Sequence, residues 1–300
     1  MNFVEKLLDV SRRQDSLLCV GLDPEIQRLP ADLRNMPVDR AVIQFCQAII
    51  EATAPYVCAY KPNLAFFEVL GPVGMQVFQE VLRAIPAHIP IIADAKRGDV
   101  GNTARNYATA VFDVYGCDAV TVNAYLGYDS VAPFLAYRDR GVILLCRTSN
   151  PGARDLQDLP VQMHGGQVRP LYEVVAERVR SWNEAGNCGL VVGATYAREL
   201  RTIRSLCPAM PILIPGVGAQ GGDLEASVSA GVDKQGERAI IAVSRAILYA
   251  DNGANYAVAA GEEARLLRDR INEARGNRAA GNRAADNRAS ARDAPTFPNE

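Results

Sequence analysis

The sequence contains very little histidine, which limits the chemistry open to it. Its two histidines, His88 and His164, lie far apart and have no metal-ligand spacing, so we do not expect a histidine-based metal site. None of its seven cysteines forms a C-x-x-C pair, and most lie in or beside apolar runs. We therefore expect buried free thiols in a reducing cytoplasm rather than disulfides or a zinc site.

Long apolar runs and a strong net charge are also missing. No uninterrupted apolar stretch approaches the roughly 18 residues that a membrane-spanning helix needs. The first segment, MNFVEKLLDVSRRQDS, has the pattern of an amphipathic helix and lacks the basic start and apolar core of a signal peptide. The formal charge of −2 argues against nucleic-acid binding driven by bulk electrostatics. These features predict a cytoplasmic protein that binds neither membranes nor nucleic acid.

Short apolar runs separated by helical stretches make up most of the chain. They are rich in Val, Ile and Leu on both faces, as parallel strands covered by helices should be. The eight runs are 17–23, 56–61, 89–96, 118–124, 141–149, 188–194, 211–216 and 239–245. Eight strand–helix units in a chain of this length fit an α/β fold of the (β/α)8 TIM-barrel type best.

The C-terminal segment has a different composition. GNRAAGNRAADNRAS, residues 276–290, is a near-perfect five-residue repeat, and apart from Pro295 no apolar residue larger than alanine follows it until Phe297. Such a segment buries too little apolar surface to offset its ordering entropy. We predict a single barrel domain over residues 1–275 and a disordered tail over 276–300. A helical extension is the alternative, since Ala and Arg favour helices.

Charged residues lie at the end of the third predicted strand, where a barrel places its chemistry. The sequence DAKRGD supplies Asp94, Lys96 and Asp99, and Lys61 ends the second strand. Asp94 and Lys96 are two residues apart, so their side chains point the same way from an extended strand. A lysine flanked by carboxylates keeps its proton, which suits a proton donor and disfavours a Schiff base. The alternative is an ion-pair network that only closes the barrel mouth.

Polar residues or glycines also end the other predicted strands. They include Asp23, Asn63, Asn123, Ser149, the glycine-rich stretch 215–223 and Arg245. Backbone N–H groups of a glycine loop beside a helix start can converge on an anion, and an arginine can add a bidentate contact. The stretch 215–223 together with Arg245 therefore predicts a phosphorylated substrate. A flexible turn and a solvated arginine are the alternative.

The same stretch matches the G-x-G-x-x-G dinucleotide motif through Gly216, Gly218 and Gly221. The motif falls at the seventh strand–helix unit instead of opening a βαβαβ half, and Ser244 and Arg245 stand where an acidic residue would bind a ribose. Since an arginine can accept a 2′-phosphate, dinucleotide binding remains an alternative.

Taken together, these motifs resemble those of the orotidine 5'-phosphate decarboxylases, in particular a longer-chain bacterial subgroup. The D-x-K-x-x-D element formed by Asp94, Lys96 and Asp99 is the most specific of them. GLDP, KPN, RTSNPGA, PGVGAQGGD and SRAI look like the family's other blocks, in the same order, over roughly residues 10–260. The resemblance implies a homodimeric enzyme of pyrimidine biosynthesis that releases CO2 from orotidine 5'-monophosphate without metal or cofactor, giving uridine 5'-monophosphate. Asn123 departs from the pattern, because many relatives carry histidine there.

The resemblance also implies a role for each matching residue. Lys96 would deliver a proton to C6 of the pyrimidine, and Asp94 would lie beside the substrate carboxylate. Asp23 and Lys61 would hold the ribose hydroxyls. The other contacts would come from Ser149 at the pyrimidine edge, from Gln220 between base and phosphate, and from Arg245 and the glycine loop with Pro215 and Gly216 at the phosphate.

Two residues would act across a subunit interface. In the family, the second aspartate of the motif and a nearby threonine, here Asp99 and Thr103, reach into the neighbouring subunit. Two rival functions remain. One is a Mg²⁺-dependent sugar-phosphate lyase or decarboxylase that shares D-x-K-x-x-D, although Lys61 stands where such relatives place an acidic residue and would repel a cation. The other is a nucleotide binder without activity, since a fold does not guarantee turnover.

Overall fold

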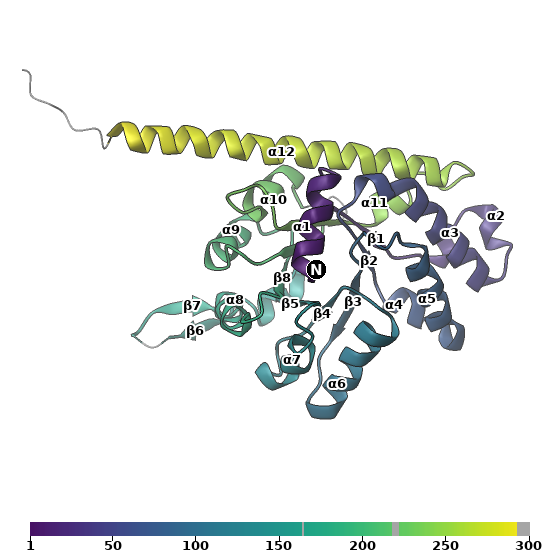
Figure 1. Ribbon diagram of the computed structural model, residues 1–300, viewed down its shortest axis with the longest axis horizontal. Helices are drawn as coiled ribbons and strands as arrows, with labels where there is room; N and C mark the ends of the chain where they lie inside the picture. The colour runs from purple at the N-terminus through teal and green to yellow at the C-terminus, as the bar shows by residue number, and fades with distance from the viewer. Residues whose placement is uncertain (164, 218–221, 293–300) are drawn as a thin grey trace, which may run out of the picture.

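The computed structural model describes residues 1–163, 165–217 and 222–292, and its centre is a parallel sheet that curves into a nearly closed barrel (Figure 1). The strands are β1 Leu18–Leu22, β2 Ala59–Pro62, β3 Ile92–Arg97, β4 Ala119–Val122, β5 Gly141–Arg147, β8 Cys188–Val192, β9 Ile212–Pro215 and β10 Ala239–Val243. Their order is β2-β1-β10-β9-β8-β5-β4-β3, and the bridges Tyr60↔Ile91 and Asn63↔Asp94 join β2 to β3. Each strand overlaps one predicted run, so the predicted TIM barrel is confirmed.

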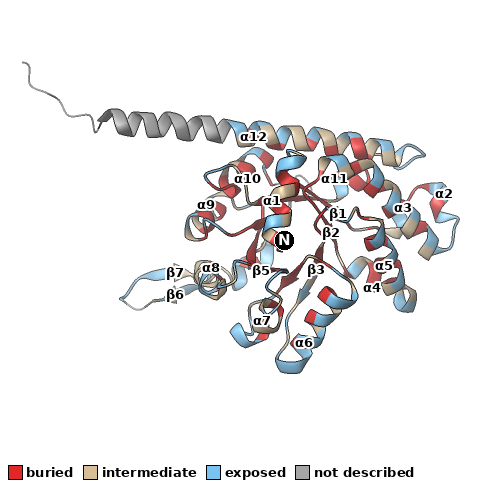
Figure 2. Cartoon of the chain, in the orientation of Figure 1, coloured by how far each residue is buried: buried red, intermediate tan, exposed pale blue. Residues whose placement is uncertain are grey.

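Helices follow the strands and surround the barrel (Figure 1). They are α1 Phe3–Arg13, α2 Ala31–Arg34, α3 Val38–Thr53, α4 Ala65–Glu68, α5 Gly74–Ala84, α6 Gly101–Thr109, α7 Tyr128–Leu135, α8 Leu171–Trp182, α9 Ala197–Leu206, α10 Leu224–Gly231, α11 Arg245–Leu248 and α12 Tyr256–Arg292. Apolar residues at helical spacing, such as Val42, Phe45 and Ile49 of α3, form the buried faces (Figure 2). Within the described part of the chain, no helix has both the length and the apolar character to cross a membrane.

Apolar side chains fill the interior of the barrel. Inward-facing residues such as Cys19, Ile143 and Leu213 form one cluster with Phe3 and Leu7 of α1. The predicted N-terminal amphipathic helix is thus confirmed as α1. Because Phe3 and Leu7 pack against the bottom of the barrel interior, a cavity can form only toward the carboxyl ends of the strands.

A β-hairpin that the sequence analysis did not predict lies between β5 and α8. Its strands are β6 Pro160–Gln162 and β7 Val168–Pro170, and they pair antiparallel and project from the barrel (Figure 1). Gly165 and Gly166 have φ angles of +91° and +81°, the left-handed conformation that a tight hairpin turn requires.

The last helix, α12, contacts α3 and α10 through its N-terminal half. Its buried residues include Ala260, Ala264, Leu267, Ile271 and Ala274. The helix continues to Arg292, so residues 276–292 are helical where we expected disorder. The docked half removes the cost of nucleation, and Ala and Arg favour continuation. Residues 293–300 lie outside the described residues, and the division of the chain at residue 275 remains a prediction.

All seven cysteines are free and buried, as the sequence predicted. Burial raises the pKa of the Cys19 and Cys188 thiols to about 12, so they remain protonated and unreactive at neutral pH.

Candidate active site

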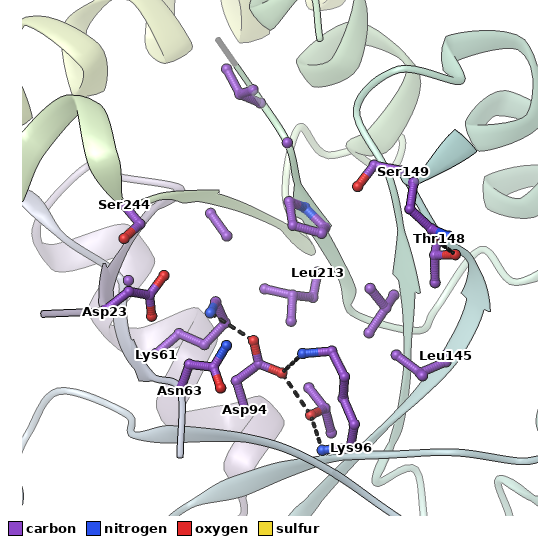
Figure 3. Close-up of a pocket in the computed structure, with 18 of the residues that line it drawn as sticks. Asp23, Lys61, Asn63, Asp94, Lys96, Leu145, Thr148, Ser149, Leu213 and Ser244 are labelled. Atoms are coloured by element: carbon purple, nitrogen blue, oxygen red, sulfur yellow. Dashed lines mark hydrogen bonds and ion pairs between the residues drawn. The ribbon is translucent and has the colours of Figure 1, made fainter. Parts of the chain in front are cut away.

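A cavity of about 660 Å³ opens at the carboxyl ends of the barrel strands. Most of the site residues predicted from the sequence line it: Asp23, Lys61, Asp94, Lys96, Ser149, Pro215, Gly216 and Arg245. Figure 3 shows the charged side chains of β1 to β3 on one side of the cavity, with Ser149 and Thr148 opposite and Leu145 and Leu213 between them. The cavity thus combines a charged side, an apolar surface and a polar loop.

Asp94 is the centre of the charged side. Its Oδ2 lies 2.8 Å from Lys61 Nζ, and its Oδ1 lies 2.6 Å from Lys96 Nζ and accepts a 3.0 Å hydrogen bond from Thr121 Oγ1 (Figure 3). The side chain of Lys61 is 8% exposed and that of Lys96 is 50% exposed. Lys61 is therefore the buried partner of Asp94, while the Lys96 ammonium is the cation that a bound molecule can reach.

Both members of the buried pair are charged. Burial favours the neutral acid of Asp94, but Lys61 and Lys96 outweigh it and hold the carboxyl pKa well below its ordinary value. Burial likewise lowers the pKa of Lys61, but Asp23 and Asp94 outweigh it and raise that pKa above its ordinary value. The attraction between the two opposite charges offsets the free-energy cost of removing each from water, which would otherwise favour the neutral forms.

Asp23 follows β1 and points into the cavity near Lys61 (Figure 3). Tyr249 holds its loop, since the tyrosine hydroxyl donates to the Asp23 carbonyl at 3.2 Å and accepts from Glu25 N at 2.6 Å. Among the described residues, Asp23 Oδ1 and Ser244 Oγ are buried polar atoms without a hydrogen-bond partner in the protein. Two such atoms facing one cavity suit a ligand that carries hydroxyl groups.

Ser149 reaches the cavity from the loop after β5. Buried Arg147 fixes the start of this loop, because its guanidinium stacks on Tyr196 at 3.8 Å and pairs with Asp158 at 3.1 Å. Gln157 Oε1 accepts from both Thr148 N and Arg147 Nη1. On the other side, a Cβ at Gly193 would lie 2.6 Å from Ser149 Cβ, so only glycine lets the serine pack so closely. These contacts give the loop a defined conformation.

The predicted phosphate end of the cavity lies at β9 and β10. Gly216 has a φ of +96°, which turns the chain sharply after Pro215, and Arg245 opens α11 beside it. The helix start that we expected to favour an anion is capped by a carboxylate instead, because Asp223 Oδ1 accepts from Ala226 N at 2.9 Å. Among the described residues at this end, Arg245 is the cation that lines the cavity and could contact a phosphate. Gln220, Gly218 and Gly221 lie outside the described residues.

The two residues predicted to cross a subunit interface lie outside the cavity lining of their own chain. Asp99 is half-buried and its carboxylate accepts from Val100 N at 2.8 Å, and Thr103 is exposed on α6. Asn123 is exposed and its side chain accepts from Tyr125 N at 3.0 Å, so it stabilises a turn after β4.

Several cavity residues were missed by the sequence analysis, notably Thr121, Gln157 and Ser244. Thr121 is the one polar residue inside the run AVTV, but threonine is common in strands and gives no signal by itself. Gln157 lies in a loop whose fold depends on Arg147, which no local pattern reveals.

The described residues contain no group of three or more His, Cys, Asp or Glu side chains that could hold a metal ion. The dinucleotide alternative does not fit the fold, since the glycine motif follows the seventh strand of a barrel and not the first strand of an open doubly wound sheet.

The fold and cavity define a class: (β/α)8-barrel enzymes whose cavity is lined both by a lysine–aspartate cluster and by an arginine that follows the last strand. Residues 16–260 match the family model described as Orotidine 5'-phosphate decarboxylase / HUMPS family. A Dehalococcoides mccartyi protein named orotidine 5'-phosphate decarboxylase is 51% identical over 275 residues, which is 92% of this chain and 99% of the relative. The protein of that name from Roseiflexus castenholzii is 53% identical over 91% of this chain and 98% of the relative.

A solved structure agrees with these matches. The OMP decarboxylase of Leishmania donovani superimposes with a TM-score of 0.79 at 42% identity, over 92% of this chain and 99% of that one. The chain therefore belongs to the orotidine 5'-phosphate decarboxylase / HUMPS family. The predictions of this family and of a decarboxylase enzyme are confirmed.

Proposed function

We propose that the chain converts orotidine 5'-monophosphate to uridine 5'-monophosphate and CO2 in pyrimidine biosynthesis, with the Lys96 ammonium as the proton donor to C6. The observation that carries this proposal is the contact of Lys96 Nζ with Asp94 Oδ1 at 2.6 Å, on the wall of a cavity that has Arg245 at another edge.

The cavity offers a complementary group for each part of a nucleotide. The unpaired Asp23 Oδ1, with Lys61 nearby, suits the ribose hydroxyls. The apolar surface between Lys96 and Ser149 suits a flat pyrimidine, whose edge Ser149 can bind by hydrogen bonds. Arg245 and the turn at Gly216 suit the phosphate, and we propose that Gln220 lies between base and phosphate.

The proposed chemistry depends on charge placement. Loss of CO2 leaves an electron pair on C6, and a fixed ammonium beside it stabilises that pair electrostatically. Lys96 then transfers a proton to C6, and its amine regains one from solvent. Asp94 holds the ammonium at the cavity wall through its 2.6 Å contact, and Lys61 keeps Asp94 ionised. Metal chemistry has no step in this scheme.

The activity itself is tested with purified chain and orotidine 5'-monophosphate, by following CO2 release and the loss of orotate absorbance. We expect turnover that EDTA does not change, because Lys61 occupies the position at which a Mg²⁺-dependent relative has an acidic ligand. Loss of turnover in EDTA, restored by Mg²⁺, would favour the metal-dependent lyase. Tight nucleotide binding without CO2 release would identify a binding protein.

We further propose that the active unit is a homodimer in which Asp99 and Thr103 complete the partner's site, since neither lines the cavity of its own chain. Lys96→Ala and Asp99→Ala chains are each expected to be inactive. After unfolding and refolding together, half of the dimers are hybrids with one intact site of two, so about a quarter of wild-type activity should return.

The control for this experiment mixes Lys96→Ala with Lys61→Ala, whose missing groups belong to one chain's cavity. That mixture should recover no activity, because a hybrid dimer of these two chains would have no intact site. If verified Lys96→Ala/Asp99→Ala hybrids stay inactive, each site is contained in one chain. The cytoplasmic location also remains a proposal, and the seven buried free thiols support it.

A further inference from the structure

The pairing of β3 with β4 is irregular at the Asp94–Lys96 segment. Ala93 pairs with Val120 in regular register, but the next pair is Arg97 with Val122. Three residues of β3 thus face a single residue of β4, Thr121, which defines a bulge. Within it Lys96 has a φ of +46°, a left-handed conformation that residues with a side chain rarely adopt.

Thr121 supplies the hydrogen bonds that regular strand pairing would otherwise provide. Its Oγ1 accepts from Ala95 N and Lys96 N, both at 3.0 Å, and donates to Asp94 Oδ1 at 3.0 Å. A hydroxyl has one proton and two lone pairs, so all its capacity is used in the bulge. Thr121 is 1% exposed, which leaves water little access to replace it.

Thr121 and the proposed proton donor, Lys96, contact the same carboxylate oxygen of Asp94. Asp94 Oδ1 accepts from Thr121 Oγ1 and is also the oxygen that Lys96 Nζ contacts at 2.6 Å (Figure 3). Thr121 therefore acts on Lys96 at both ends, by fixing its backbone amide and by orienting the carboxylate that holds its ammonium. A β-branched side chain has few rotamers, which adds to this rigidity.

We propose that Thr121 is a positioning residue for the decarboxylation: its hydroxyl holds the Asp94–Lys96 bulge so that the Lys96 ammonium meets C6. This inference rests on the proposed function. It assigns Thr121 no contact with the reacting atoms.

The test compares Thr121→Val, which keeps the shape but loses the hydroxyl, with Thr121→Ser, which keeps the hydroxyl. For Thr121→Val we expect kcat to fall by about 10–100-fold while KM for orotidine 5'-monophosphate changes less than about 3-fold, because a small misplacement affects chemistry more than the distant phosphate contacts. Thr121→Ser should keep kcat within about 3-fold of wild type.

Thr53→Val is the matched control. Thr53 is also a buried threonine, and its hydroxyl donates to Ile49 O and contacts Tyr60 Oη, away from the cavity. The Thr53→Val variant should have a lower melting temperature than wild type and an unchanged kcat. If Thr121→Val does not fold, Thr121→Ala replaces it in the same comparison.

A crystal structure of Thr121→Val separates this inference from the proposed function. We expect Lys96 to leave its left-handed conformation and Nζ to move away from Asp94 Oδ1, whatever the wild-type activity. Absence of wild-type turnover would refute the proposed function alone. An unmoved Lys96, an unchanged kcat in Thr121→Val, or a Thr121→Ser variant as slow as Thr121→Val would overturn the positioning role.

Discussion

Replacing Lys96 with methionine is expected to lower kcat by about 10⁴-fold or more, because the change removes both a proton donor and a positive charge beside C6. Methionine has a similar length but carries neither a proton to give nor a charge. The fold should survive, since half of the Lys96 side chain is exposed and Asp94 retains Lys61 and Thr121. Steady-state turnover of orotidine 5'-monophosphate measures the effect.

Two comparisons make the Lys96→Met result interpretable. Binding of the product uridine 5'-monophosphate should change only a few-fold, because its ribose and phosphate contacts lie elsewhere in the cavity. Lys234→Met, at an exposed lysine in the loop between α10 and β10, should behave as wild type. Full activity of Lys96→Met would show that Lys96 has no role in the mechanism. It would also refute the proposal that the Asp94 cluster is the reaction centre.

Replacing Arg245 with alanine is expected to lower kcat/KM by about 10²–10⁴-fold, because a phosphate would lose two charge-assisted hydrogen bonds of about 1.5–3 kcal/mol each. The loss should be large because the start of α10 is already capped by Asp223 and leaves Arg245 as the main cation at that end. Part of it should appear in kcat, since binding energy from a remote group can assist the chemical step.

The control substrate for Arg245→Ala is orotidine, which lacks the phosphate. Wild type and variant should process orotidine at nearly equal, low rates. The substitution should therefore lower kcat/KM only for the phosphorylated substrate. Arg201→Ala, at an exposed arginine of α9, should have no effect on either substrate. An equal penalty with and without the phosphate would show that Arg245 acts on something else.

The elements that sequence reasoning found are those whose signal is local. Each barrel strand is an apolar run between polar turns, so all eight could be located from composition and spacing. Asp94 and Lys96 were predicted to share one wall from their spacing in an extended strand, and they do meet at the cavity. The segment is a bulge with Lys96 at a φ of +46°, however, so this placement depends on the bulge and not on the spacing alone. The Gly165–Gly166 hairpin also had a local signal, a glycine pair between short β-prone segments, and could have been predicted.

The other features that the sequence did not reveal depend on contacts between distant segments. From its own composition the repeat over residues 276–290 was expected to be disordered, with a helical extension as the alternative, and it lies within α12, whose first half is docked on the barrel. Thr121 gained its importance from a register shift against β3, which no pattern within β4 reveals. The conformation of the Ser149 loop depends on Arg147 stacking on Tyr196, across a long separation in sequence.

The hydrogen bonds of Tyr249 have a consequence for when the cavity can form during translation. The tyrosine hydroxyl fixes the loop of Asp23 across separations of 224 and 226 residues, and β1 pairs with β10, the last strand. A chain emerging from the ribosome would carry Asp23, Lys61 and Lys96 early, yet it could not assemble their shared cavity until nearly the whole barrel had been translated. A nascent or truncated product ending before Tyr249 would therefore be unable to compete with finished enzyme for the nucleotide.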